Sequence, residues 1–238
     1  MTPQEKLVAT AVNEVGYIGH KSAAQLDTPT ANGGGKYNKY ARDLDALGDF
    51  YNGPKQGFDW CDVFVDWCFV QTFGRELAQK MIAQPDRSAG AGTGYSLGYY
   101  KAKGRFFSSP QVGDQIFFGD TKSTWHTGIV TGVTQGTVRT VEGNSGTPLG
   151  VHAFSYPQSA GYIKGYGRPD WALVPAGTEQ AGPADTSYRT LDDVPDWAKS
   201  AVGKCVDRGA LQGDGGGLNL SRDLCRTLVV LDRLGKLD

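Results

Sequence analysis

The side chains that could carry out covalent chemistry are few in this 238-residue chain, which has four cysteines and three histidines. Cys61 lies at the predicted start of a buried helix, where unpaired backbone N–H groups and the helix dipole stabilise a thiolate. A thiolate is the nucleophile that acyl transfer needs, and it requires a base nearby. Cys61 is therefore the candidate nucleophile. The other cysteines, which we interpret as small buried hydrophobic residues, are Cys68, Cys205 and Cys225.

His126 is the candidate base, on the condition that the strands on either side of a predicted hairpin pair in one register. A three-residue loop centred on Gln135 would place His126 opposite Asn144. The same register puts Glu142 on the face that carries both, because residues two apart on a strand share a face. A carboxylate or amide beside an imidazole fixes its tautomer and orientation. A two-residue turn would shift the register by one and separate the three side chains.

The elements that must position these residues follow the order of helices first and strands later. Apolar residues at helical spacing predict helices over residues 4–16, 62–73, 76–83 and 95–103, with 37–47 as a further helix or an ordered loop. Runs of β-branched and aromatic residues predict strands over residues 114–119, 127–133, 137–141 and 162–166. This order is typical of an α+β domain whose helices pack on an antiparallel sheet.

The end of the chain predicts a second, smaller domain. Residues 172–187 are rich in small and turn-forming residues and are interpreted as a flexible linker after a first domain of residues 1–171. Residues 188–238 are predicted to form a small all-α domain, with one helix over residues 195–208 and a second capped by Ser221. Two helices this short bury little alone, so we expect them to pack tightly on each other or on another copy of the chain.

Composition excludes several classes of function. The net charge of −1 gives no overall basic field for nucleic acid or anionic lipid. No apolar run approaches the roughly 18 residues that a membrane span needs. The first residues lack the basic and apolar segments of a signal peptide, so we expect synthesis in the cytoplasm and release by some other route.

Four blocks of the sequence resemble, in the same order, those of the CHAP (cysteine, histidine-dependent amidohydrolase/peptidase) family. They are Asp59–Cys68 (DWCDVFVDWC), Val112–Phe118 (VGDQIFF), His126–Val130 (HTGIV) and Val141–Asn144 (VEGN). The resemblance covers roughly residues 4–171 and is strongest to the CHAP domains of phage and prophage endolysins. It implies a papain-like α+β fold and the cleavage of bacterial peptidoglycan.

The resemblance also implies a role for each candidate residue. Cys61 would be the nucleophile and His126 the base. Glu142 would orient the histidine, and Asn144 would be a further polar partner. Members of the family often have a small residue after the cysteine, whereas this chain has Asp62, whose charge would oppose a thiolate unless it points away or caps the helix.

Two accessory roles have weaker support. Some members of the family bind calcium upstream of their cysteine, where this chain has Asp43, Asp45 and Asp49. Their spacing fits no EF-hand loop, so we favour a solvated helix face and expect no cofactor. Gln56 could add a side-chain donor to an oxyanion hole that uses the backbone N–H of Cys61, although a polar loop residue is the favoured interpretation.

The C-terminal segment is similar to part of an S-layer-homology module, a kind of domain that binds cell-wall polymers. The similarity rests on Asp193–Ala198 (DVPDWA) and on Gly209–Gly215 (GALQGDG). It implies that residues 188–238 bind a secondary cell-wall polymer, while a role in forming a homo-oligomer stays open. Trp197 could be a core residue or a platform for a sugar.

The sequence thus predicts a peptidoglycan hydrolase of the endolysin type that reaches the wall after release from the host cytoplasm. Amidase and endopeptidase activities use the same residues, so both stay open. One alternative is a zinc amidase that uses His20, His126 and His152, although the chain has no HExxH pattern. The other alternative is a non-catalytic protein that binds the wall through a degenerate site.

Overall fold

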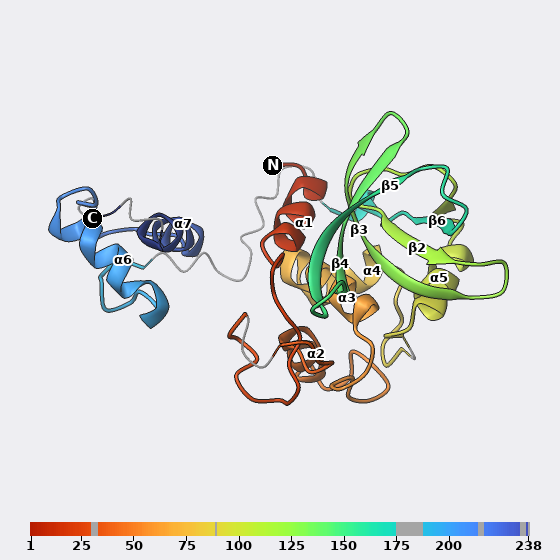
Figure 1. The fold of residues 1–238 in the computed structure, drawn as a ribbon, viewed down its shortest axis with the longest axis horizontal. Helices are drawn as coiled ribbons and strands as arrows, with labels where there is room; N and C mark the ends of the chain where they lie inside the picture. The colour runs from red at the N-terminus through yellow and green to blue at the C-terminus, as the bar shows by residue number, and fades with distance from the viewer. Residues whose placement is uncertain (30–32, 89, 175–187, 214–216, 234–236, 238) are drawn as a thin grey trace. The chain divides into compact units, whose positions relative to one another are not determined.

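The computed structural model describes residues 1–29, 33–88, 90–174, 188–213, 217–233 and 237 (Figure 1). Contacts within the chain divide it into an N-terminal unit, residues 1–179, and a C-terminal unit, residues 180–238. Each unit is described by itself.

The N-terminal unit contains an antiparallel sheet, which for the described residues has six strands in the order β1-β6-β2-β3-β4-β5. The strands are β1 (Phe106–Phe107), β2 (Gln115–Gly119), β3 (Thr124–Thr134), β4 (Thr137–Ser145), β5 (Gly150–Pro157) and β6 (Ile163–Gly167). The four predicted strands correspond to β2, β3, β4 and β6, whereas β1 and β5 were not predicted. Strand β5 pairs with β4 at one edge of the sheet, where few of its side chains are buried. The predicted α+β class is confirmed.

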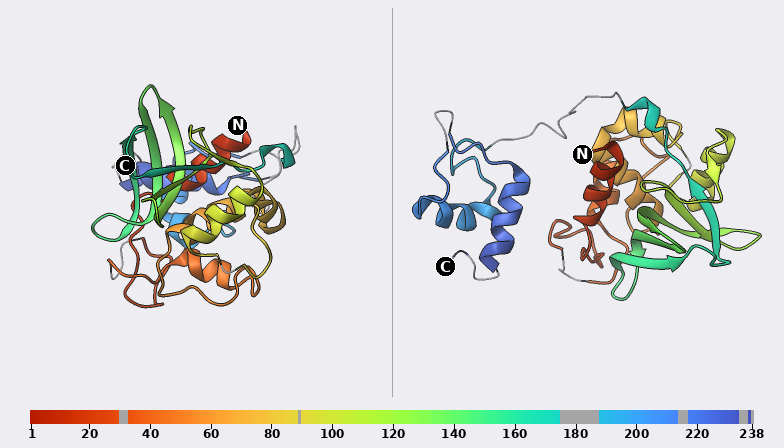
Figure 2. Two further views of the ribbon diagram at one scale, coloured as in Figure 1. Left: turned by 90° about the vertical axis from the view of Figure 1, so that its right-hand side faces the viewer. Right: turned by 90° about the horizontal axis from the view of Figure 1, so that it is seen from above.

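Helices cover one face of this sheet (Figure 1, Figure 2). They are α1 (Pro3–Val12), α2 (Lys39–Asp45), α3 (Cys61–Phe73), α4 (Arg75–Met81) and α5 (Thr93–Ala102). Helix α3 lies against β3 and β4 and also contacts α1, α2 and α4, which explains why it is apolar nearly all round. The short helix η1 (Trp171–Leu173) includes two residues of the predicted linker, and Trp171 packs on Phe69 and Phe73 of α3.

Alternation along the strands gives the sheet two apolar faces. One face contributes to the main core with α3, through Phe117, Ile129, Val141 and Val151. The other face has a smaller core of its own, formed by Ile116, Phe118, Val130, Val138 and Tyr166. His126 pairs with Phe118 across β2 and β3, so its side chain belongs with this second face.

The β3–β4 hairpin has the predicted pairing of Ile129 with Val141, but its turn and a bulge in β3 were not predicted. Thr134 pairs with Thr137, so the turn has two residues, and the prediction of a three-residue loop is wrong. A bulge between Val130 and Gly132 then inserts one extra residue into β3. The bulge restores the pairing of Ile129 with Val141 that the longer loop would have given. The predicted register is therefore confirmed as far as the pair of Ile129 and Val141, where the ladder ends.

Gly143 allows α3 to approach β4 closely beside the candidate site. A Cβ atom at this position would lie 2.5 Å from Cβ of Phe64 and 2.8 Å from Cζ3 of Trp60. Contacts this short would force the helix and strand apart. The absence of a side chain at residue 143 is thus what lets the start of α3 sit against the sheet.

The C-terminal unit has its own core, built on α6 (Asp196–Asp207) and α7 (Arg222–Arg233). Ser221 accepts a hydrogen bond from the Leu224 N–H at 3.1 Å, which confirms the predicted helix cap. Trp197 is 44% exposed, so it is not a core residue. Throughout the described part of the chain, the helices are too short or too polar to cross a lipid bilayer.

Candidate active site

Cys61 is the first residue of α3, and its side chain is almost fully buried. Burial, with the charges of Asp62 and Asp59, raises the pKa of the Cys61 thiol to about 12. Backbone N–H groups of Asp62 and Thr127 face the sulfur and offset this shift only in part. The prediction that the helix start depresses this pKa is therefore wrong, because burial outweighs the helix terminus.

The resting nucleophile is consequently a neutral thiol. A thiol whose pKa is raised this far keeps its proton at pH 7. A thiol of this kind needs a base that removes its proton as the sulfur attacks. The Thr127 N–H that faces the sulfur belongs to the residue after His126 in β3, which makes His126 the candidate for this base.

The imidazole of His126 is held by a carboxylate and an aromatic ring. Its Nε2 atom lies 2.8 Å from Oε2 of Glu142. The Phe118 ring stacks on the imidazole with centroids 5.7 Å apart. Because a carboxylate only accepts hydrogen bonds, this contact places the imidazole proton on Nε2 and leaves a lone pair on Nδ1. The neutral ring can therefore act as a base through Nδ1.

Glu142 is a buried carboxylate that receives several hydrogen bonds. Thr140 donates to its Oε1 at 2.5 Å, and the Tyr156 hydroxyl donates to its Oε2 at 3.3 Å. Burial and the charge of Glu142 raise the pKa of Tyr156, so this hydroxyl stays protonated and remains a donor. These donors fix the orientation of the carboxylate, which in turn fixes that of His126.

Asn144 does not pair with His126 in the way predicted. The ladder between β3 and β4 ends at Ile129 and Val141, short of both residues. Asn144 has a positive φ of 54°, and its amide nitrogen donates to Oδ1 of Asp59 at 3.2 Å. The structure thus brings His126 and Glu142 together and places the Cys61 sulfur at the N–H of Thr127, the residue after His126, while it ties Asn144 to the loop that precedes α3.

Asp62 points toward α5 and β2 rather than into solvent. It is fully buried and accepts hydrogen bonds from the Ser96 hydroxyl at 2.6 Å and from Nε2 of Gln115 at 2.8 Å. Burial raises its pKa to about 6 in spite of these donors. Its charge still acts on Cys61, because it is one of the causes that raise the pKa of the thiol.

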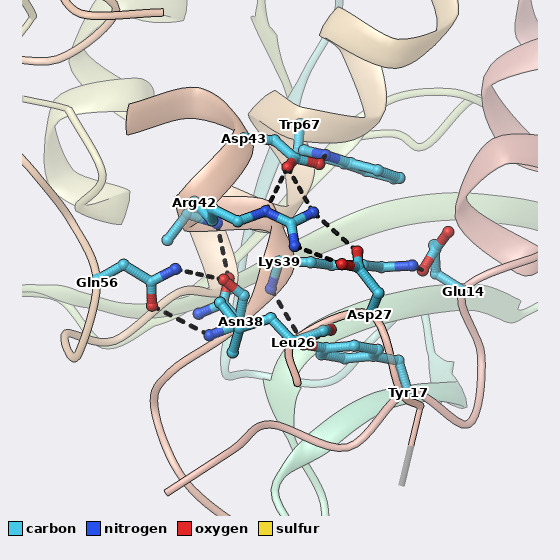
Figure 3. A network of polar contacts seen from close by, with 11 residues as sticks. Glu14, Tyr17, Leu26, Asp27, Asn38, Lys39, Arg42, Asp43, Gln56 and Trp67 are labelled. Carbon is cyan, nitrogen blue, oxygen red and sulfur yellow. Dashed lines mark hydrogen bonds and ion pairs between the residues drawn. The ribbon is translucent and has the colours of Figure 1, made fainter. Parts of the chain in front are cut away.

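Gln56 serves the loop that precedes α2. Its Nε2 donates to the carbonyl of Asn38 at 2.5 Å, and its Oε1 accepts from the backbone N–H of Asn38 at 3.2 Å (Figure 3). Asn38 itself caps α2 by accepting from the Ala41 N–H at 2.7 Å. Both polar ends of Gln56 are engaged in this structural contact, which favours the loop interpretation over an oxyanion donor.

The three upstream carboxylates each have a different partner. Asp43 accepts from Nε1 of Trp67 at 2.9 Å (Figure 3), Asp45 accepts from the Lys55 N–H at 2.9 Å, and Asp49 pairs with Arg75 at 2.6 Å. Among the described residues, no three side chains of histidine, cysteine, aspartate or glutamate are grouped to hold a metal ion. The carboxylates therefore stabilise the loops around α2 and α3.

The histidines do not converge on one point. Nε2 of His20 contacts the carbonyl of Thr28 at 3.0 Å, and Nε2 of His152 contacts the carbonyl of Pro148 at 2.9 Å. His126 contacts Glu142 instead. This arrangement gives no support to a zinc site made of the three histidines.

Comparison with known proteins identifies the segment that contains this arrangement. No curated protein and no solved structure gives a significant match to the chain. Residues 53–144 match the model of the CHAP domain, and this range includes Cys61, His126, Glu142 and Asn144. A CHAP domain is therefore found at residues 53–144, and it suggests that the chain is a peptidoglycan amidase or peptidase.

Proposed function

We propose that the chain hydrolyses an amide bond of bacterial peptidoglycan, with Cys61 as the nucleophile and His126 as the base. The observation that carries the proposal is the position of the Cys61 thiol at the N–H of Thr127, the residue that follows His126, whose imidazole Glu142 holds through Nε2. The CHAP domain at residues 53–144 supports peptidoglycan as the substrate.

The geometry supports a general-base mechanism. Nδ1 of His126 takes the thiol proton as Sγ of Cys61 attacks the carbonyl carbon, and buried Glu142 stabilises the imidazolium that forms. The imidazolium then protonates the leaving amine, and a thioester to Cys61 remains. Water, deprotonated by His126, hydrolyses the thioester to a carboxylic acid and restores the thiol. The backbone N–H of Cys61, in the first turn of α3, is the proposed oxyanion donor.

Mass spectrometry of purified peptidoglycan digested with the protein tests this function directly. We expect fragments that have gained one water and carry a new amino terminus. A terminus at the first stem residue would identify an amidase, and one inside the stem or bridge would identify an endopeptidase. Iodoacetamide should abolish the products because it blocks Cys61, and the zinc chelator phenanthroline should not. Products that survive iodoacetamide and disappear with phenanthroline would contradict the proposal and favour a zinc amidase.

We also propose that the enzyme acts as an endolysin and that its C-terminal unit attaches it to the wall. The exposed indole of Trp197 on α6 supports this role, because an exposed aromatic ring offers a flat surface to a sugar. Trp197→Ala should reduce severalfold the fraction of protein that pellets with walls. Leu224→Ala, which removes a 38% exposed side chain of α7, is the matched control. Equal pelleting of wild type and Trp197→Ala would contradict wall attachment through this residue.

A further inference from the structure

A chain of hydrogen bonds between buried side chains joins the start of α3 to β2 and β3. Nε2 of Gln115 donates to Oδ1 of Asp62 at 2.8 Å and to Oγ1 of Thr127 at 3.0 Å. The Thr127 hydroxyl donates onward to the carbonyl of Ile116 at 2.7 Å. An amide nitrogen has two hydrogens and a hydroxyl has one, so this arrangement uses every hydrogen that the two groups can donate.

This chain of hydrogen bonds lies in the interior of the N-terminal unit. Asp62, Gln115 and Thr127 are each at most 1% exposed. The second carboxyl oxygen of Asp62 accepts from the Ser96 hydroxyl of α5, so the same carboxylate also fixes that helix. Water does not compete for these bonds at this depth, and leaving any one of them unmade would be costly. The relative positions of α3, α5, β2 and β3 are therefore set by polar contacts as well as by packing.

Two residues joined by these hydrogen bonds, Asp62 and Thr127, also contact the candidate nucleophile through their backbones. The backbone N–H groups that face the Cys61 sulfur belong to Asp62 and Thr127, the residues whose side chains Gln115 joins. As the thiol loses its proton, these N–H groups stabilise the negative sulfur only if they remain aimed at it. Gln115 thus acts on Cys61 through two residues without touching it.

The charge of Asp62 has the opposite effect from its hydrogen bonds. A carboxylate close to the thiol disfavours the thiolate, as does Asp59, and both raise the pKa of Cys61. Asp66, one turn further along α3, faces Asp62 in turn and accepts from the Tyr51 hydroxyl at 2.7 Å. The donors to these two buried carboxylates are neutral groups, so they hold the carboxylates in place without cancelling their charge.

We propose that Asp62 and Gln115 are positioning residues that hold the N–H of Thr127 against Sγ of Cys61, and that the reaction uses their hydrogen bonds and not the charge of Asp62. The inference rests on the proposed function of Cys61 as the nucleophile. It assigns to Gln115 a part in the reaction that its location in the core of the sheet does not reveal.

The test measures the rate of Cys61 alkylation in variants that separate the effect of the Asp62 charge from the effect of the hydrogen bonds. Asp62→Asn keeps an acceptor for Gln115 and removes the charge, and Gln115→Leu in the Asp62→Asn background removes both donors without changing any charge. Iodoacetamide adducts on the Cys61 peptide would be counted by mass spectrometry between pH 6 and 10. We expect Asp62→Asn to react about tenfold faster than wild type at pH 8, from a shift of about one pKa unit. The double variant should react about tenfold more slowly than Asp62→Asn.

A second pair of variants guards against loss of fold, which thermal unfolding and near-UV circular dichroism would reveal. In the Asp62→Asn background, Thr127→Val removes the hydroxyl and should slow alkylation, whereas Thr127→Ser keeps it and should restore the rate. Equal rates for folded Thr127→Val, Thr127→Ser and Asp62→Asn, or slower alkylation of Asp62→Asn than of wild type, would overturn the proposal. Alkylation needs no wall substrate, so failure of the proposed function would show separately, as a wild-type protein that releases no products.

Discussion

Cys61→Ala should abolish the release of new amino termini from purified bacterial walls. The variant removes the sulfur that the structure places beside the Thr127 N–H and leaves the other side chains of the candidate site in place. Loss of the nucleophile from a site of this kind lowers the rate by about 10³- to 10⁶-fold. The decrease should appear in kcat, measured from amine release at saturating substrate. Cys61→Ser should also be nearly inactive, because a hydroxyl is far less acidic than a thiol.

Cys68→Ala provides the matched control. Cys68 lies two turns further along α3, fully buried in the main core, and is not part of the site. Its replacement should cost about 1 kcal/mol of unfolding free energy, from the small cavity that it leaves, and should preserve hydrolysis. Lysis of walls by Cys61→Ala at the wild-type rate would show that the thiol is not the nucleophile.

The hairpin shows how far strand register can be predicted from sequence. Alternation and turn residues indicated both strands, and the pairing of Ile129 with Val141 is confirmed. The predicted loop length was wrong, and the bulge between Val130 and Gly132 compensated for it. A bulge depends on how a strand bends to meet its neighbours on both sides, and β3 lies between β2 and β4. The local sequence contains little of that information.

The protonation state of Cys61 could not be predicted from the sequence for a similar reason. A helix start at Cys61 could be predicted, and the structure confirms it. The strand that covers the thiol could not be predicted, because β3 lies more than 60 residues further along the sequence. Burial then decides the pKa, and the helix terminus contributes the smaller effect.

The groups that hold Glu142 were missed for two different reasons. Thr140 lies two residues before Glu142 on β4, and period-two alternation could have indicated that the two share a face. Tyr156 lies on β5, an edge strand that the pattern of apolar residues did not indicate. Hydrogen-bond donors that come from neighbouring strands can be identified only once the order of the strands in the sheet is known.

His126→Ala should lower kcat at pH 7 by about 10²- to 10⁴-fold and should change the shape of the pH profile. In the wild type Nδ1 takes the thiol proton during the attack, so the rate should not follow the ionisation of the thiol. Without the imidazole, only thiolate formed by exchange with solvent can attack. The raised pKa of Cys61, about 12, means that the thiolate fraction keeps growing as the pH rises toward that value. The rate of the variant should therefore increase about tenfold per pH unit between pH 7 and 10.

The slope of this profile distinguishes a base from a structural residue. A variant that merely loosens the site would keep the wild-type profile at a lower level, whereas loss of the base exposes the ionisation of the thiol itself. His20→Ala is the matched control and should leave the shape of the profile unchanged, since Nε2 of His20 contacts the backbone carbonyl of Thr28 and His20 pairs with Tyr37, outside the strands that carry His126 and Glu142. Added imidazole should restore part of the rate of His126→Ala by supplying the missing lone pair. A flat profile for His126→Ala, parallel to that of the wild type, would mean that another group removes the proton from Cys61.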